Sequence, residues 1–280
     1  MSNPIPAITE ANATGEIAEI FADIRRVLRV DVVNLIWRHL ATIPGALPRA
    51  WESLRPLYVD GTIGAEAAAL HGDLDFPRLP PFPREVLAAA GLLDDDIRTI
   101  RNILAAYDRT NAMALVALSA LLLHLEGKPL RLAPSSRGAS AAREPLALIP
   151  LPPLLNLADM PPATAELVLT LNRLGTRRDN PILASMYRHL AYWPTYLSLT
   201  WAFIAPLDAD GSLARSIDDA IAKAQTRAAR HVMTLHAQSA MSIAPSDRAA
   251  IRLAIEPFAG DVIAKMVVIC GTLRAASGNL

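Results

Sequence analysis

Five polar side chains in this sequence have types and spacings that could support acid–base chemistry: Thr62, Glu66, Tyr107, Asn111 and Asp179. Thr62 and Glu66 are four residues apart, as are Tyr107 and Asn111, so each pair shares one face if its segment is helical. Asn111 precedes a strongly apolar run, and a polar amide on such a helix must find hydrogen-bond partners or meet a ligand. Helix capping or buried hydrogen bonding would explain the same residues without chemistry, so both interpretations stay open.

The elements that must position these residues belong to an internal repeat. Residues 38–61 match residues 188–211 at an offset of 150 without a gap, with 11 identities in 24 positions. Chance would give roughly one identity in fifteen positions. The register continues with one inserted residue, so that residues 96–101 align with residues 247–252. We infer a tandem duplication.

The repeat predicts the organisation of the chain. Residues 1–127 form a first unit and residues 163–280 a second, joined by residues 128–162, whose eight prolines suit a long crossover rather than a helix. Alanine- and leucine-rich segments between proline- and glycine-marked turns indicate an all-α fold. Two similar helical units are expected to pack as an intramolecular pseudo-dimer with a site between them.

Helix signals within each unit are moderate. Apolar residues recur at helical spacing over residues 10–28, and acidic residues at Asp94 predict the start of a helix. A second-unit helix is predicted to begin at Pro245. Asp179, two residues before Pro181, is predicted to cap another helix.

A chemical site between similar halves needs groups that differ between them. Positions shared by both halves are explained by shared packing, which demotes four residues, namely His39, His189, Trp51 and Trp201. The five candidates named above survive, because the other half has a different residue at each equivalent repeat position. In chain order of the candidates, these counterparts are Ser212, Ser216, Phe258, Val262 and Arg29. His71 lies near Asp73 and Asp75, but without a second histidine at ligand spacing a solvated acidic loop is the simpler interpretation.

Composition excludes several partners. The chain of 280 residues carries 27 basic and 27 acidic side chains, so it has no broad field for nucleic acid or an anionic membrane. The apolar run over residues 113–122 is about half the length that spans a bilayer. The one cysteine, Cys270, lies in an apolar run and is predicted to be core. The first ten residues lack a secretory pattern, which favours a cytoplasmic location. The balanced charge favours a small-molecule partner.

The repeated Arg-His-Leu-Ala with its following proline and tryptophan, the unmatched Asp179, and the segment from Tyr107 to Asn111 resemble the group I 2-haloacid dehalogenase family over both repeats. The resemblance implies an all-α pseudo-dimer that assembles into homodimers. It also implies hydrolysis of 2-halocarboxylic acids such as 2-chloropropionate to 2-hydroxy acids, with inversion and without a cofactor or metal. Arg177 and Arg178 depart from the family pattern as an unusually cationic approach to Asp179.

Carried over by motif position, the family's catalytic aspartate falls on Asp179 and its water-positioning asparagine on Asn111. The accompanying polar pair falls on Thr62 and Glu66. The substrate-binding residues that we expect around them are Tyr107, Arg178, Asn180, Trp37, Tyr187 and Trp193.

The chemistry requires an oxygen that attacks in line behind the carbon–halogen bond, a base for its proton and a dry pocket. Asp179 is predicted to be the base and Asn111 to hold the water. A helix N-terminus near Asn180 would donate N–H groups to the substrate carboxylate, and aromatic side chains would line the halide pocket.

Two other classes of protein remain as alternatives. One is a helical protein of the alkylhydroperoxidase and carboxymuconolactone decarboxylase type, although the Cys-x-x-Cys pair of its redox branch is missing. The other is a non-enzymatic helical scaffold that binds small acids. Halide release from racemic 2-chloropropionate would separate turnover from binding alone.

Overall fold

The computed structural model describes residues 5–126, 151–231 and 245–277, and every regular element in these ranges is helical, which confirms the all-α prediction. The first part of the chain forms η1 (Glu10–Asn12), α1 (Gly15–Leu28), α2 (Leu35–Leu40), α3 (Ala46–Val59), α4 (Thr62–Asp73), α5 (Arg84–Ala89) and α6 (Asp94–Glu126). The second part forms η2 (Leu157–Asp159), α7 (Pro162–Arg173), α8 (Ser185–Leu190), α9 (Pro194–Ala209), α10 (Ser212–Ala229), α12 (Pro245–Pro257), the π-helical turn η3 (Phe258–Val262) and α13 (Ile263–Ser277).

The helix boundaries repeat along the chain. α2 and α8 each have six residues and begin at 35 and 185, while α4 and α10 begin at 62 and 212. The 33 residues of α6, from 94 to 126, match the range 245–277 that α12, η3 and α13 cover. The second unit therefore has helices where the sequence repeat expects them, including the one-residue shift. Most of the predicted crossover, namely residues 128–150 of the range 128–162, lies outside the described ranges.

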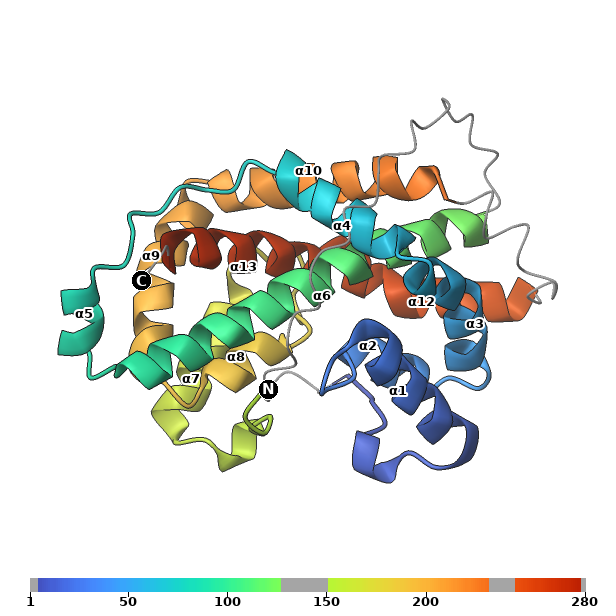
Figure 1. Ribbon diagram of the computed structural model, residues 1–280, viewed down its shortest axis with the longest axis horizontal. Helices are drawn as coiled ribbons and strands as arrows, with labels where there is room; N and C mark the ends of the chain where they lie inside the picture. Colours follow the sequence, from blue (N-terminus) through green and yellow to red (C-terminus); the bar gives the residue numbers. More distant parts are fainter. Residues whose placement is uncertain (1–4, 127–150, 232–244, 278–280) are drawn as a thin grey trace.

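α6 and α13 form the centre of the molecule (Figure 1). α6 is buried on all sides from Thr110 to Leu121, and α13 is buried from Ile263 to Leu273. Helices that are apolar around their whole circumference must be covered by other helices. α4 and α10 pack against α6, while α1–α3 and α7–α9 gather at opposite sides of this central pair (Figure 1). The part of the chain that is described contains no helix long and apolar enough to cross a membrane.

The repeated Asp-Gly dipeptides make the turns into α4 and α10. Gly61 and Gly211 have φ angles of 83° and 75°, a left-handed conformation that glycine adopts without a steric penalty. Asp60 Oδ1 accepts a hydrogen bond from the Thr62 backbone N–H at 2.9 Å, and Asp210 does the same for the next helix at 2.7 Å. Identity at these repeat positions therefore reflects shared turn geometry.

Two of the predicted helix starts are confirmed and one is wrong. α6 begins at Asp94 and α12 at Pro245, as expected. Asp179 does not cap a helix, because α8 begins only at Ser185. Pro181 disfavours the helical conformation for the residue before it, which accounts for the irregular backbone after Asp179.

Candidate active site

A cavity of about 150 Å³ lies where two short segments, residues 29–38 and 182–189, face the central helices. The first segment leads into α2 and the second into α8, so the cavity draws its walls from both halves of the chain. α6 contributes residues from Asn102 to Asn111, and η3 with α13 contributes residues from Phe258 to Met266. A cavity of this size suits a small ligand.

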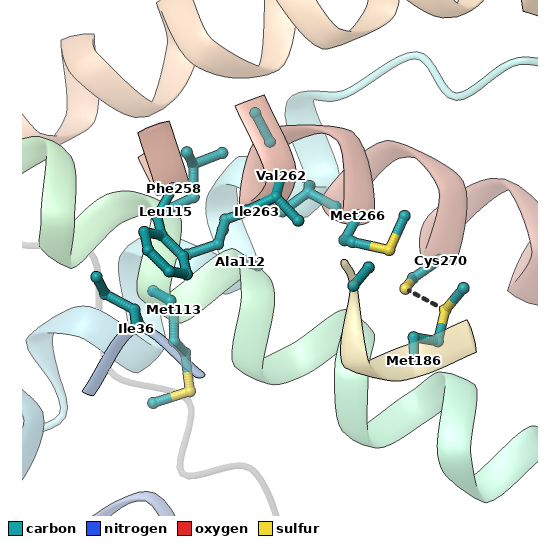
Figure 2. Close-up of a cluster of buried hydrophobic side chains, with 14 of the residues drawn as sticks. Ile36, Ala112, Met113, Leu115, Met186, Phe258, Val262, Ile263, Met266 and Cys270 are labelled. Carbon is teal, nitrogen blue, oxygen red and sulfur yellow. Dashed lines mark hydrogen bonds between the residues drawn. The ribbon is translucent and has the colours of Figure 1, made fainter. Parts of the chain in front are cut away.

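The apolar floor of the cavity is built from side chains of four elements, which belong to the buried hydrophobic cluster drawn in Figure 2. Ile36 comes from α2, Met186 from α8, Phe258 from η3, and Met266 from α13. Beneath them Cys270 is fully buried, with its Sγ 3.2 Å from the Met186 Sδ. Burial raises the pKa of the Cys270 thiol, which confirms this cysteine as part of the core.

Asn111 is the polar group that stands out in this cavity. It lies on α6 and is 7% exposed, and its Nδ2 has no oxygen or nitrogen acceptor among the described residues and lies beside the Cys270 thiol, a weak acceptor. A buried amide donor without a partner carries a desolvation penalty that a bound water or ligand would remove. The sequence predicts that Asn111 either finds hydrogen-bond partners or meets a ligand. Its position in the cavity lining supports the second interpretation.

Tyr107 lies one turn before Asn111 and also lines the cavity. Its Oη is 2.7 Å from Nδ1 of His189 on α8. Burial, reinforced by the charge of Arg188, lowers the pKa of His189 to about 4, and burial raises the pKa of Tyr107. Both groups are therefore uncharged at neutral pH.

The Tyr107–His189 pair has a counterpart in the other half. His39 and Phe258 occupy the equivalent repeat positions, and their ring centroids are 5.6 Å apart, as are those of Tyr107 and His189. A position shared by both halves thus carries a polar pair on one side only. Comparison of the two halves demotes His189 because the histidine repeats. The signal for its role is the difference at the other position of the pair, where Phe258 in one pair corresponds to Tyr107 in the other.

At the rim of the cavity, the turn at the end of α1 is held in place by Arg109 of α6. Arg29 has a left-handed backbone with φ 52°, which is uncommon outside glycine. Arg109 donates hydrogen bonds to the carbonyl oxygens of Leu28 and Arg29 at 3.0 and 2.9 Å, so it fixes this turn. Asp31, two residues further on, is exposed and is the one carboxylate among the described residues that line the cavity.

Of the four residues predicted to converge on one cavity, two are found in the lining of this cavity. Tyr107 and Asn111 line it, whereas Asp179 and Thr62 do not. Asp179 is exposed, as are Arg178 and Asn180, which do not line the cavity either. Because no helix begins near Asn180, the expected helical N–H donors for a substrate carboxylate are missing at that position.

The segment before Asp179 is anchored by a buried carboxylate that sequence analysis missed. Asp261 in η3 is 4% exposed and accepts hydrogen bonds from the Thr176 hydroxyl at 3.0 Å and from the Arg177 backbone N–H at 3.1 Å. The Arg177 guanidinium pairs with Asp218 at 2.5 Å. The segment is thus tied to η3 and α10, and Arg177 does not face the cavity.

Thr62 and Glu66 belong to the contact between α4 and α10. Thr62 starts α4, and the Glu66 carboxylate binds Arg227 at 2.9 Å and His231 at 3.1 Å. The hydrogen bond from His231, followed by that from Arg227, lowers the pKa of Glu66 against the effect of its burial. These partners explain Glu66 by helix packing, the turn at Asp60 explains Thr62 as the first residue of α4, and neither residue is in the cavity lining.

The three predicted aromatic residues also lie outside the cavity. Trp37 and Tyr187 are fully buried and occupy the same repeat position, so they are core residues of the two halves. The ring of Trp37 packs edge-on against Trp51, with centroids 5.5 Å apart. Trp193 donates its indole N–H to Asp96 at 2.8 Å. None of these three rings is therefore available to line this cavity as the expected halide pocket.

His71 is bound to another buried carboxylate. Its Nε2 is 3.1 Å from Oδ2 of Asp108, which also pairs with Arg274 of α13. No group of three or more histidine, cysteine or acidic side chains in the described ranges is arranged to hold a metal ion.

Comparisons with known proteins agree with this architecture. No protein-family model matches the chain. A "2-haloacid dehalogenase, configuration-inverting" from Alcaligenes xylosoxydans xylosoxydans is 32% identical over 222 residues, which cover 74% of this chain and 71% of the relative. A D-2-haloacid dehalogenase mutant has a similar fold, with a TM-score of 0.75, 18% identity, and coverage of 98% of this chain and 96% of its own. A mutant of such an enzyme in complex with D-2-CPA has a TM-score of 0.69 at the same identity and coverage. The length and identity of the first match show that the chain belongs to the family of configuration-inverting 2-haloacid dehalogenases.

Proposed function

We propose that this chain hydrolyses short 2-haloalkanoic acids to 2-hydroxyalkanoic acids with inversion, by direct attack of water at the carbon that bears the halogen. The observation that carries the proposal is the position of Asn111, a nearly buried amide in the lining of a small cavity with an apolar floor. Family membership supplies the reaction class. The complex of a neighbour with D-2-CPA supports a 2-haloacid as the substrate class.

In this mechanism Asn111 orients the nucleophile. One water O–H donates to the amide Oδ1, the other O–H donates to a carboxylate, and a lone pair then points at Cα. The halide leaves on the opposite side, which inverts the configuration. The apolar floor keeps bulk water away from the reacting carbon and accommodates the polarisable halogen.

In this proposal the base is an aspartate. The family resemblance supports Asp179 for this role, whereas the cavity lining supports Asp31. Asp179 is the residue that the motif assigns, and it lies outside the cavity lining. Asp31 lines the cavity from the first half of the chain. Activity of matched variants distinguishes the two, as described in the Discussion.

We also propose that the two units, residues 1–127 and 163–280, pack about a pseudo-two-fold axis and that the chain forms homodimers. The equal spacing of helix boundaries and the matching His39–Phe258 and His189–Tyr107 ring pairs support the first part. The resemblance alone supports the homodimer, which light scattering of the purified protein would test.

Turnover is tested by chloride release from D- and L-2-chloropropionate, each incubated separately with purified protein. We expect chloride together with lactate of the opposite configuration. Folded protein that binds the acid without releasing chloride would instead support a small-acid-binding scaffold. A single turnover in ¹⁸O-water with enzyme in excess should label the product hydroxyl, whereas a labelled protein carboxylate with an unlabelled product would indicate an ester intermediate.

A further inference from the structure

The cavity contains a cationic side chain that the reaction scheme has not used. Arg38 lies on α2 and lines the cavity together with Tyr107 and Asn111. Its Nε is buried and has no hydrogen-bond partner, and its guanidinium forms no ion pair with any described residue. Burial lowers the pKa of Arg38, although a guanidinium stays charged at neutral pH. Arg38 is partly buried, and a guanidinium whose buried nitrogen has no partner is stabilised when an anion binds to it.

The arginine at the equivalent repeat position is satisfied by the protein itself. Arg188 donates from Nε to the Leu155 carbonyl oxygen at 2.6 Å and from its terminal nitrogen to the Asn156 side-chain oxygen at 3.0 Å. Arg188 is not among the residues that line the cavity. The duplication thus placed two arginines at one repeat position, and only Arg38 is left with its hydrogen-bond donors toward the cavity.

The groups around Arg38 do not neutralise it. Tyr107 and His189 are uncharged, and Arg109 is occupied by the carbonyl oxygens at the end of α1. Glu10 attracts Arg38 at longer range, but its carboxylate binds Arg25 and the Val33 N–H. The inner part of the cavity is therefore positive, beside an apolar floor.

We propose that Arg38 binds the carboxylate of the substrate, so that the site recognises short monocarboxylic acids through the guanidinium of the first half of the chain. The planar guanidinium can donate two parallel hydrogen bonds to a carboxylate, which orients the acid as well as attracting it. With the carboxylate on Arg38, the Cα atom and its halogen extend between Asn111 and the apolar floor. Arg38 takes the role that the sequence assigned to helix N–H groups near Asn180.

This inference rests on the proposed function for the identity of the acid, but its test uses unreactive ligands. Binding of propionate and of its neutral analogue propionamide is measured by calorimetry on the full chain and on the variants Arg38→Met, Arg38→Lys and Arg188→Met. We expect Arg38→Met to weaken propionate binding at least about tenfold, since charged hydrogen bonds contribute this much or more, and to leave propionamide binding unchanged. Arg188→Met is the matched control and should retain propionate binding within about twofold, since its position does not line the cavity.

The lysine variant keeps the test decisive if Arg38→Met fails to fold. Lysine retains the charge without the planar fork, so Arg38→Lys should bind propionate several-fold more weakly and should raise KM for 2-chloropropionate more than it lowers kcat. Equal propionate affinity in folded Arg38→Met, or wild-type affinity in Arg38→Lys, would overturn the inference. Wild-type protein that binds propionate through Arg38 yet releases no chloride would refute the proposed function and leave the inference standing. Wild-type protein that releases chloride without binding propionate would refute the inference about Arg38 and leave the proposed function standing.

Discussion

At the scale of single residues, the site is defined by polar groups without protein partners. Asn111 and Arg38 both line the cavity and both carry buried nitrogen atoms that no described residue satisfies. Tyr107 and His189 share a hydrogen bond and are both uncharged, so they form a neutral wall. A carboxylate would bind Arg38, and a water would bind the amide of Asn111.

We predict that Asn111→Ala lowers kcat for 2-chloropropionate by about 10² or more, because a preorganised hydrogen-bonding group that fixes the reacting water contributes on this order. Propionate binding should change little, since the carboxylate contacts Arg38. Steady-state kinetics and calorimetry measure the two effects. A variant with normal kcat would remove Asn111 from the mechanism.

The base is identified by a pair of matched substitutions, Asp31→Asn and Asp179→Asn. Each amide fits the space of the acid and cannot accept the proton, so the variant of the true base should release no measurable halide, with fold and ligand binding intact. Position in the cavity lining leads us to expect the larger loss in Asp31→Asn, whereas the resemblance leads to the larger loss in Asp179→Asn. Chloride release at saturating substrate decides between them, and full activity in both variants would contradict a mechanism with either base.

At the scale of elements, the short helices α2 and α8 contribute to the cavity lining, and packing against the core positions them. α2 and α8 have only six residues each, too few to be stable alone, so packing of Trp37 and Tyr187 into the core positions them. Arg109 fixes the turn after α1, and Asp261 fixes the segment before α8. Burial of Lys265, which neighbours Asp261, lowers the pKa of this lysine to about 8.

The contact between α4 and α10 gives a prediction about pH. The folded state lowers the pKa of Glu66, so its contribution to stability is fully present above the unfolded value near 4.5 and declines as pH falls through the lower folded pKa. Glu66→Gln should therefore destabilise the protein by about 1 kcal/mol at neutral pH and much less at pH 3. Urea unfolding at both pH values measures this difference. The matched variant Thr62→Ala should retain kcat, and a large loss of kcat in either variant would return these residues to the active site.

At the scale of the whole molecule, the two halves depend on each other. α6 of the first half and α13 of the second pack side by side (Figure 1), and they are buried around their circumference over residues 110–121 and 263–273. Residues 29–38 and 182–189 also meet at one cavity. Neither half alone contains a complete core or a complete site.

We predict that residues 1–127, expressed alone, do not form a cooperatively folded monomer, because the apolar surface that α13 covers on α6 would be exposed to water. Coexpression with residues 163–280 should restore the native helical signal and chloride release. Circular dichroism melting curves of each fragment and of the mixture provide the measurement. A sharp two-state transition for the isolated monomeric fragment would contradict this dependence.

The sequence by itself determined the helical class, the repeat spacing, the Asp-Gly turns and the position of Asn111. These properties depend on residues close in the chain, and one helical turn is enough to relate Tyr107 to Asn111. Only the tertiary structure decided which side chains reach the cavity, because packing between distant helices selects them. Trp37 and Arg38 are neighbours, yet one is core and the other lines the cavity. Comparison of the two halves demoted His189 as a repeated residue and did not single out Arg38, because a repeat shows where a side chain recurs and not whether its partners recur with it.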